Sequence, residues 1–184
     1  KHKKNMVTTS YVSPEMASLD GNARAEDVLI LNEIGVDPGI DHMSAMKIFD
    51  EVQYKGGRIV SFMSYCGGLP APQHNTNPLG YKFSWAPKGV LIAAGNNAQY
   101  LRDGEIVKIP GKDLFSHYWL VDVPGAGTYE AYPNRDSLSY IETYGLEGIK
   151  TIYRGTFRNV SHCETWYALA QLGFFNKEGE VVDT

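Results

Sequence analysis

Hydrophobic and polar positions along this chain predict strands and helices in series. Beta-branched residues dominate positions 6–12 and predict a strand, and the apolar run at 28–31 predicts a second strand that is buried on both faces. Between them, Ser13 followed by Pro14 is typical of a helix start, and Gly21 is expected to end that short helix. A strand, a helix and a strand in this order indicate the end of an α/β unit.

A helical stripe follows the turn-rich segment 32–39. Apolar residues recur every three positions from Ile40 and predict one long helix, which the glycine pair at 56–57 ends. Asp37 is predicted to cap this helix, with Pro38 at its first helical position. The residues of the stripe are Ile40, Met43, Ala45, Met46, Ile48, Phe49 and Val52.

The remaining pattern predicts more strands with helices between them. Strands are expected at 58–66, 81–85, 105–109, 117–123, 128–132 and 149–160, and helices at 90–101, 137–144 and 164–172. No internal repeat is visible. This order favours an α/β (α+β) fold in which a mixed sheet is covered by helices.

Composition supports a folded domain and narrows its partners. The chain has 184 residues, of which 43% are hydrophobic and 21% charged, as in proteins with a packed core. Its net charge of −4 argues against nucleic acid as the main partner, and no apolar run is long enough to span a membrane. Two cysteines, Cys66 and Cys163, are too few and too widely spaced for a disulfide framework or a cysteine zinc site.

Both ends of the chain suggest a piece of a longer protein. It opens on Lys1-His2-Lys3-Lys4 without a methionine, and it stops at Val181-Val182-Asp183-Thr184 without a finishing element. No long apolar stretch follows the basic opening, so we do not interpret it as a secretory signal.

Six ordered blocks of residues resemble the saccharopine dehydrogenase (glutamate-forming) family, also called the saccharopine reductases. The blocks lie at 7–14, 32–42, 64–72, 77–85, 132–137 and 154–158, and they include Asp37-Pro38-Gly39, Cys66-Gly67-Gly68 and Thr156-Phe157-Arg158. The resemblance implies an oxidoreductase of lysine metabolism. Such an enzyme interconverts saccharopine with 2-aminoadipate 6-semialdehyde plus glutamate, by hydride transfer between NADP(H) and a C–N bond.

The resemblance also implies how the chain is divided. Family members begin with a dinucleotide-binding domain, whose glycine fingerprint is absent here because Gly125-Ala126-Gly127 lies between predicted strands. Residues 1–36 are therefore expected to be the tail of that Rossmann domain and the hinge. Residues 37–184 are expected to be a substrate-binding, catalytic and dimerisation domain, incomplete at its C-terminus, that resembles the C-terminal domain of glyceraldehyde-3-phosphate dehydrogenase. NADP(H) would be bound mainly by the preceding domain, so the isolated chain is expected to fold but to be inactive.

Saccharopine carries three carboxylates and one free ammonium, so its site needs forked cations and an acceptor. From the residues alone, Arg135 is open to a second interpretation as a surface partner of Asp136, and Arg158 as an exposed strand arginine. Arg154 is expected on the same strand face as Arg158. The substrate-binding residues that the resemblance implies are Ser10, Tyr11, Asp37, Arg135, Thr156, Phe157 and Arg158.

The resemblance further implies residues that contact the cofactor. Hydride transfer to an imine needs no cysteine nucleophile, so Cys66 is assigned to the nicotinamide end, with a buried small hydrophobe as the alternative. Trp85 has a core or interface position as its alternative. Asp37 is expected to accept the substrate ammonium, and Asp37, Tyr65 and Tyr11 are the candidate acid/base groups. The expected cofactor contacts are Ser10, Val36, Asp37, Cys66 and Trp85.

Two other functions remain open. One is a related reductase of the carboxyspermidine or homospermidine synthase type, and the other is a non-catalytic dimerisation or regulatory module. Glu33, Asp37, Asp41 and His42 have metal-ligand chemistry, but the expected reaction needs no metal and none is predicted. The expected partners are small-molecule substrates and a second copy in a homodimer. The expected compartment is the cytoplasm, or the mitochondrial matrix in an animal.

Overall fold

The computed structural model describes residues 3–176, so the opening Lys1-His2 and the end at Val181–Thr184 lie outside the described residues. The chain divides into two compact units, Lys1–Arg58 and Ile59–Thr184. The first unit therefore extends past position 36, where the sequence predicts a hinge, and includes the helix that follows. Among residues 3–176, no helix is both long enough and apolar enough to cross a membrane.

The first unit is a small parallel sheet with three helices. Its elements are β1 (Met6–Val7), α1 (Pro14–Ala17), α2 (Asp20–Ala25), β2 (Ile30–Leu31) and α3 (Ile40–Tyr54). Helix α1 begins as predicted, because Ser13 Oγ accepts a hydrogen bond from the Met16 N–H at 3.2 Å. The prediction that Gly21 ends the helix is wrong. Gly21 lies inside α2, which the Asp20–Arg24 ion pair supports at helical spacing.

The parallel strands β1 and β2 pair Met6 with Ile30 and Val7 with Leu31. The sequence predicts a strand buried on both faces at 28–31, and here the structure differs. Leu29 is 53% exposed and Leu31 is 40% exposed, since each strand has a single partner within the described residues. Parallel strands normally have covered faces.

Helix α3 confirms the predicted helix but corrects its start and its buried face. Gly39, not Asp37, occupies the cap position, and its N–H donates to the Asp41 carboxylate at 2.6 Å. Gly39 has φ +149°, and a Cβ there would lie 2.1 Å from Gly35 O, so the turn needs glycine. Ala45 and Phe49 are buried, whereas Ile40, Met43, Met46 and Ile48 are exposed.

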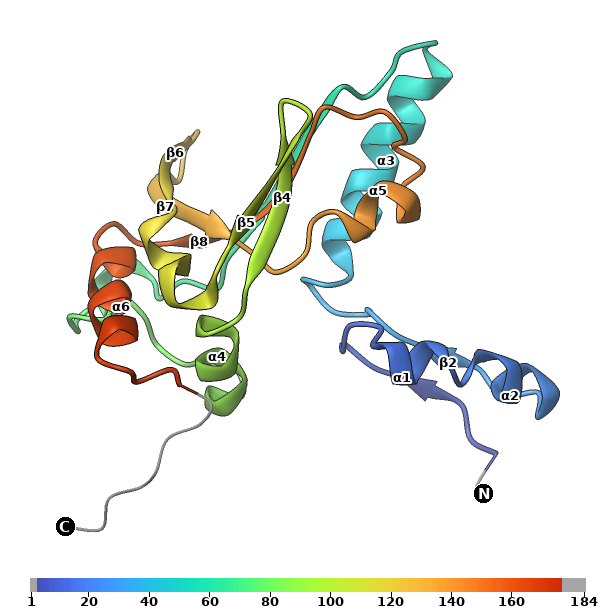
Figure 1. Ribbon diagram of the computed structural model, residues 1–184, viewed down its shortest axis with the longest axis horizontal. Coiled ribbons are helices and arrows are strands. Elements are labelled where there is room, and N and C mark those ends of the chain that lie inside the picture. The colour runs from blue at the N-terminus through green and yellow to red at the C-terminus, as the bar shows by residue number, and fades with distance from the viewer. Residues whose placement is uncertain (1–2, 177–184) are drawn as a thin grey trace. The chain divides into compact units, whose positions relative to one another are not determined.

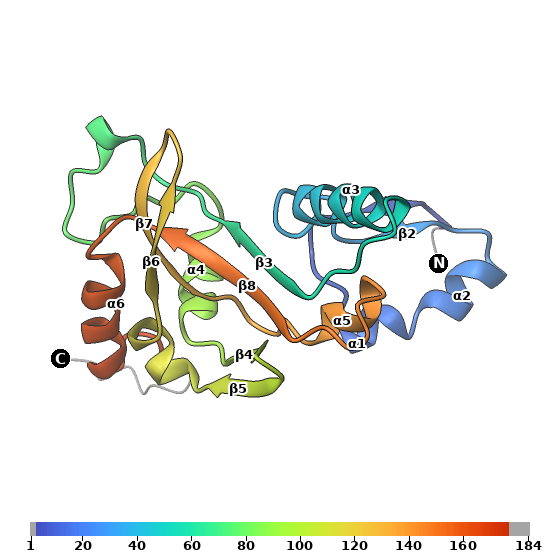
Figure 2. The ribbon, with the colours of Figure 1, turned by 90° about the horizontal axis from the view of Figure 1, so that it is seen from above.

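The second unit is a six-stranded mixed sheet (Figure 1). Its strands run in the order β5-β4-β8-β7-β6, and β3 pairs with β8 in parallel while the other pairs are antiparallel. Figure 2 shows β3 and β8 running side by side in the same direction. The strands are β3 (Ser61–Cys66), β4 (Ala98–Arg102), β5 (Glu105–Ile109), β6 (Trp119–Val123), β7 (Gly127–Pro133) and β8 (Thr151–Arg158).

Helices accompany this sheet, so the predicted mixed α/β fold is confirmed. They are α4 (Pro87–Ala94), α5 (Ser139–Thr143), α6 (His162–Gln171) and the 3₁₀ helices η1 (Pro72–His74) and η2 (Gly111–Ser116). The core of the unit gathers aromatic residues from strands and helices, among them Tyr81, Tyr100, Phe115, Tyr153 and Trp166.

Two predicted elements of the second unit are wrong. The segment 81–85 is not a strand, and the predicted helix at 90–101 ends at Ala94, after which the chain turns into β4. Gly95 and Gly111 explain the break, because a Cβ on Gly111 would lie 2.2 Å from Gly95 O. The close approach of these two backbones requires a turn where the apolar pattern predicted a continuing helix.

Candidate functional site

In the first unit, the predicted residues Ser10, Tyr11, Val36 and Asp37 follow two neighbouring strands. Ser10 and Tyr11 follow β1, and Val36 and Asp37 follow β2, which is parallel to β1. Both segments therefore lie beyond the carboxyl ends of parallel strands, where open α/β sheets bind their ligands. The backbone joins the segments, because the Glu33 N–H donates to Ser10 O at 3.1 Å.

Asp37 is held by Tyr11. The Tyr11 hydroxyl donates to Asp37 Oδ1 at 2.9 Å, and both side chains are half-buried. Asp37 does not cap α3. Its carboxylate is instead bound by Tyr11, from the segment after β1. Val36 beside it is 62% exposed. The structure thus brings together the residues of this unit that were assigned to substrate and cofactor.

The other acidic residues near this edge have structural roles. Glu33 Oε1 accepts the Val12 N–H at 3.1 Å, and Glu33 Oε2 lies 2.8 Å from His42 Nε2. Asp41 accepts the Gly39 N–H. Within residues 3–176, no three His, Cys, Asp or Glu side chains gather as metal ligands would.

In the second unit, one row of residues crosses three strands and includes two predicted site residues. Cys66 on β3 pairs with Thr156 on β8, and Thr156 pairs with Tyr132 on β7. Register partners project to the same face of a sheet, so these three side chains are neighbours. A Cβ on Gly67 would lie 2.5 Å from Phe157 O, so the glycine after Cys66 lets the chain pass close to β8.

Arg158 lies on the same face, two residues beyond Thr156, as the strand period predicts. It is only 8% exposed, which corrects the interpretation of an exposed strand arginine. Its guanidinium carbon lies 4.8 Å from the Tyr81 ring and 5.7 Å from the Tyr132 ring, and Nη1 donates to Phe157 O at 2.8 Å. Within residues 3–176, Arg158 Nε is buried without a hydrogen-bond partner. One donor of this buried cation therefore lacks an acceptor among the described residues.

A buried acid and a buried histidine surround Arg158, and sequence reasoning missed both. Glu130 is the register partner of Arg158, and its two oxygens accept the N–H groups of Ser161 and Cys163, each at 2.7 Å. His162 Nδ1 donates to Leu79 O at 2.8 Å. Burial, and to a lesser extent the positive charge of Arg158, lowers the pKa of His162 to about 3, so the ring is neutral at pH 7. The start of α6 is thus fixed beside Arg158 without a second positive charge.

Cys163 and Cys66 differ in their surroundings. Burial raises the pKa of the Cys163 thiol, and the nearby Glu130 carboxylate raises it further, so Cys163 is an inert core thiol. Cys66 is half-buried at the end of β3. Of the two cysteines, only the predicted one lies in the row with Thr156.

Tyr65 and Phe157 project to the opposite face of the sheet from Cys66, Thr156 and Arg158, because neighbours along a strand alternate. Their rings stack with centroids 4.8 Å apart, and the Tyr65 hydroxyl accepts the Trp119 Nε1–H at 3.3 Å. Tyr65, proposed from sequence as an acid/base group, is therefore separated by the sheet from Arg158. Trp85 is 53% exposed and lies over Gly89, where a Cβ would meet its ring at 2.6 Å.

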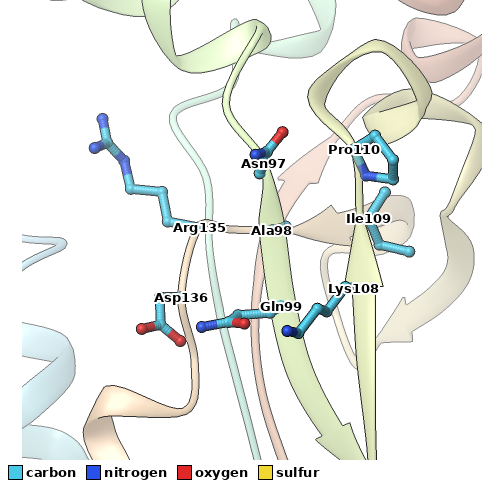
Figure 3. Close-up of a pocket in the computed structure, with 8 residues that line it drawn as sticks. All are labelled: Asn97, Ala98, Gln99, Lys108, Ile109, Pro110, Arg135 and Asp136. Carbon is cyan, nitrogen blue, oxygen red and sulfur yellow. The ribbon is translucent and has the colours of Figure 1, made fainter.

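Arg135 lies at a hollow of about 480 Å³ on the β4–β5 side of the sheet (Figure 3). It has φ +52°, a left-handed conformation that arginine seldom adopts. Its carbonyl accepts the Gln99 N–H at 2.8 Å, and Asp136 Oδ1 accepts the Leu138 N–H at 2.8 Å. The lining of this hollow does not include Thr156 or Arg158. The residues that line it are Asn97, Ala98, Gln99, Lys108, Ile109, Pro110, Arg135 and Asp136.

Comparisons with known proteins agree on one family. Residues 35–183 match the model described as the saccharopine dehydrogenase C-terminal domain. The chain is 46% identical over 180 residues to a protein of Schizosaccharomyces pombe named saccharopine dehydrogenase [NADP(+), L-glutamate-forming], covering 98% of this chain and 40% of that protein. It is 45% identical over 183 residues to the alpha-aminoadipic semialdehyde synthase of Arabidopsis thaliana, covering 98% of this chain and 17% of that protein.

A solved structure agrees with this. The apo saccharopine dehydrogenase (L-Glu forming) of Saccharomyces cerevisiae superposes with a TM-score of 0.83 at 41% identity, over 96% of this chain and 40% of that one. The chain thus spans about two fifths of the length of these dehydrogenases.

Proposed function

This chain belongs to the saccharopine dehydrogenase C-terminal domain family, and on that premise we propose that it is the substrate-binding part of an NADP(H)-linked saccharopine dehydrogenase. The complete protein would interconvert saccharopine with 2-aminoadipate 6-semialdehyde plus glutamate. The observation that supports this most strongly is the 46% identity over nearly the whole chain to a relative named for that reaction.

The second unit supplies cations for the carboxylates of saccharopine. Arg158 is buried, has an unpartnered Nε–H, and lies beside Thr156, whose hydroxyl is a further donor. A carboxylate would take up the spare donor of Arg158, and such charge-assisted bonds are strong where water is excluded. Arg135, which lines the hollow beside β4 and β5, would bind a second carboxylate. The backbone of Phe157 would hold Arg158 in place through its carbonyl.

The first unit supplies the acceptor for the substrate ammonium. Asp37 is the proposed partner of that ammonium, and Tyr11 fixes the carboxylate through its hydrogen bond. Ser10 lies at the same edge and would contribute its hydroxyl. The same pair is the preferred candidate for moving a proton during dehydration. Tyr65 ranks behind it, because its hydroxyl is engaged with Trp119 on the other face of the sheet from Thr156.

The residues at the edge of β1 and β2 fit the nicotinamide end of a dinucleotide, since they follow the carboxyl ends of parallel strands. Ser10, Val36 and Asp37 would hold it there, and Cys66 and Trp85 are the proposed contacts from the second unit. NADP(H) supplies or accepts the hydride, and the residues of this chain orient the C–N bond and exclude water. The exposed Leu29 and Leu31 support assigning residues 1–36 to the end of the dinucleotide-binding domain, whose remaining strands would cover them.

The complete protein is further proposed to be a homodimer of the cytoplasm or the mitochondrial matrix. The family resemblance supports both statements. Light scattering of the purified complete protein tests the first, and localisation of a tagged copy tests the second.

The test of the function is turnover by the complete protein. Saccharopine and NADP⁺ are supplied, and formation of NADPH and of glutamate is followed together. We expect both products in equal amounts, whereas no turnover of saccharopine would overturn the proposal. Faster turnover of polyamine analogues that lack the carboxylates would favour a homospermidine synthase-type reductase instead.

Replacement of Arg135 by glutamine identifies its role within this reaction. Loss of one charged hydrogen bond to a carboxylate is expected to raise the KM for saccharopine by about ten- to a hundredfold. An unchanged KM would remove Arg135 from the substrate site without affecting the assignment of the reaction.

A further inference from the structure

The hollow beside Arg135 contains a second cation that no sequence motif indicated. Lys108 on β5 is the register partner of Gln99 on β4, and the backbone of Gln99 forms an isolated β-bridge with Asp136. Lys108, Gln99 and Asp136 thus form a row across three neighbouring segments, on one face and within side-chain reach of each other. Figure 3 shows their polar ends gathered beside one another, while Arg135 extends in the opposite direction.

Two polar groups of this row have no partner among the residues that the structure describes. Within residues 3–176, the Lys108 ammonium and the Gln99 side-chain amide make neither a hydrogen bond nor an ion pair. Asp136 is different, because its Oδ1 is occupied by the Leu138 N–H. The hollow therefore offers one free ammonium and one free amide at one end, and a guanidinium at the other.

The volume and charge of the hollow fit a small anion with two charged groups. About 480 Å³ lies within the range of ligand pockets, and two cations outnumber the single carboxylate of Asp136. The cationic ends are separated, so they suit two carboxylates some distance apart rather than one carboxylate gripped twice. Arg135 is also held in a left-handed backbone conformation, a strain that proteins retain at binding sites.

We propose that Lys108 and Gln99 bind the side-chain carboxylate of the glutamate portion of the substrate, and that Lys108 makes the enzyme selective for a dicarboxylic amino acid. The proposal rests on the proposed function and deepens it. Arg135 would bind the second carboxylate of the same glutamate portion. Lys108 would be a specificity-determining residue, because an amine substrate without the side-chain carboxylate leaves its charge unpaired.

The experiment compares glutamate with glutamine in the reductive direction, using the complete protein with 2-aminoadipate 6-semialdehyde and NADPH. Glutamine has nearly the shape of glutamate but lacks the charge of the side-chain carboxylate. In Lys108→Met we expect kcat/KM for glutamate to fall by about tenfold, while kcat/KM for glutamine and the KM for NADPH stay unchanged. Lys108→Arg should restore most of the preference for glutamate.

The matched control is Lys112→Met, which removes an exposed lysine of η2 that does not line the hollow. This variant should keep the wild-type preference. As a second measurement, glutarate should inhibit the wild type more strongly than it inhibits Lys108→Met, because it carries both carboxylates and no amine.

Three results are distinct. A wild type that makes no saccharopine from glutamate refutes the proposed function itself. A wild type that does so, with an unchanged glutamate-to-glutamine ratio and unchanged glutarate inhibition in Lys108→Met, overturns the role of Lys108 alone. An equal loss for glutamate and glutamine in that variant also overturns it, because a general structural effect would not depend on the side-chain charge.

Discussion

The hydroxyl of Tyr11 donates a hydrogen bond to Oδ1 of Asp37 at 2.9 Å, joining two segments that lie 26 residues apart in the sequence. The bond connects the segment after β1 to the segment after β2, so it fixes the carboxylate at the edge where the parallel strands end. Asp37 is thereby oriented by a neighbour that is itself a predicted ligand contact.

Tyr11→Phe removes this bond and leaves the ring in place. We expect a loss of about 1 kcal/mol in the free energy of unfolding and a rise of about three- to tenfold in the KM for saccharopine, because the Asp37 carboxylate loses the hydrogen bond from Tyr11 that orients it. Urea unfolding and steady-state kinetics of the complete protein measure the two effects. Asp37→Asn is the companion variant, and it should have the larger KM because the negative charge itself is lost. A Tyr11→Phe protein with the KM of wild type would show that the hydroxyl does not position Asp37.

Arg158→Lys keeps the positive charge but loses the planar fork. We expect the KM for saccharopine to rise by about ten- to a hundredfold, since a lysine cannot offer the unpartnered Nε–H together with the Nη1–H that binds Phe157 O. The matched control is Arg102→Lys, at an arginine whose guanidinium also lies over aromatic rings, 4.8 Å from the Trp119 ring. That control should keep the wild-type KM. Equal KM values in both variants would exclude Arg158 as a carboxylate ligand.

His162 predicts how stability depends on pH. Its pKa is about 3 in the folded protein, against 6.5 for an unperturbed histidine, so between these pH values the unfolded chain binds a proton that the folded chain does not. The free energy of unfolding should therefore fall as the pH drops from about 6.5 towards about 3, by a few kcal/mol at most. Above pH 7 this histidine contributes no pH dependence.

His162→Asn tests this, because an asparagine amide can donate to Leu79 O as Nδ1–H does but cannot take up a proton. The variant is expected to be less stable at pH 7.5 and to lose less stability than wild type on going to pH 5. Urea unfolding midpoints of wild type and variant at pH 7.5 and pH 5 measure this difference. Parallel losses in wild type and variant would contradict the prediction.

Gly155 provides a test of packing on the face that carries Tyr65. A Cβ there would lie 2.5 Å from Tyr153 Cε1 and 2.9 Å from Tyr65 Cδ1. The two rings contact each other, and Tyr153 also contacts Trp119, so neither ring can move aside easily. Gly155→Ala should cost about 1–3 kcal/mol of unfolding free energy, measured in urea. Gly68→Ala is the control, since its Cβ would have only Ser84 Oγ nearby, at 3.6 Å. A Gly155→Ala protein as stable as this control would show that the rings can yield.

The sequence pattern predicted most elements because their signals are local. Ser13 and Pro14 form a helix start from their own chemistry, and the strands at 105–109 and 128–132 follow from their composition. The predicted helix at 90–101 failed because of a distant contact. The apolar run after Val90 ends at Gly95 because Gly111, sixteen residues later, needs room beside it.

Which side chains meet was harder to predict from the sequence than which elements form. Asp37 was expected to cap α3, a local role, but a tyrosine 26 residues away binds it instead. Glu130 could not be identified, since a single acid in a strand looks the same whether it faces water or the N–H groups of Ser161 and Cys163. Lys108 gave no signal either, because its position beside Arg135 depends on the register of β4 with β5 and with the loop at Asp136.

The left-handed backbone at Arg135 sets selection for stability against selection for substrate binding at this position. Asparagine or glycine would adopt φ +52° at lower cost, so selection for thermal tolerance alone should favour exchanging the arginine. Any such exchange removes the guanidinium of a residue that lines the hollow. Laboratory evolution that screens only for heat resistance should therefore replace this residue early. Evolution that also screens for saccharopine turnover should keep it.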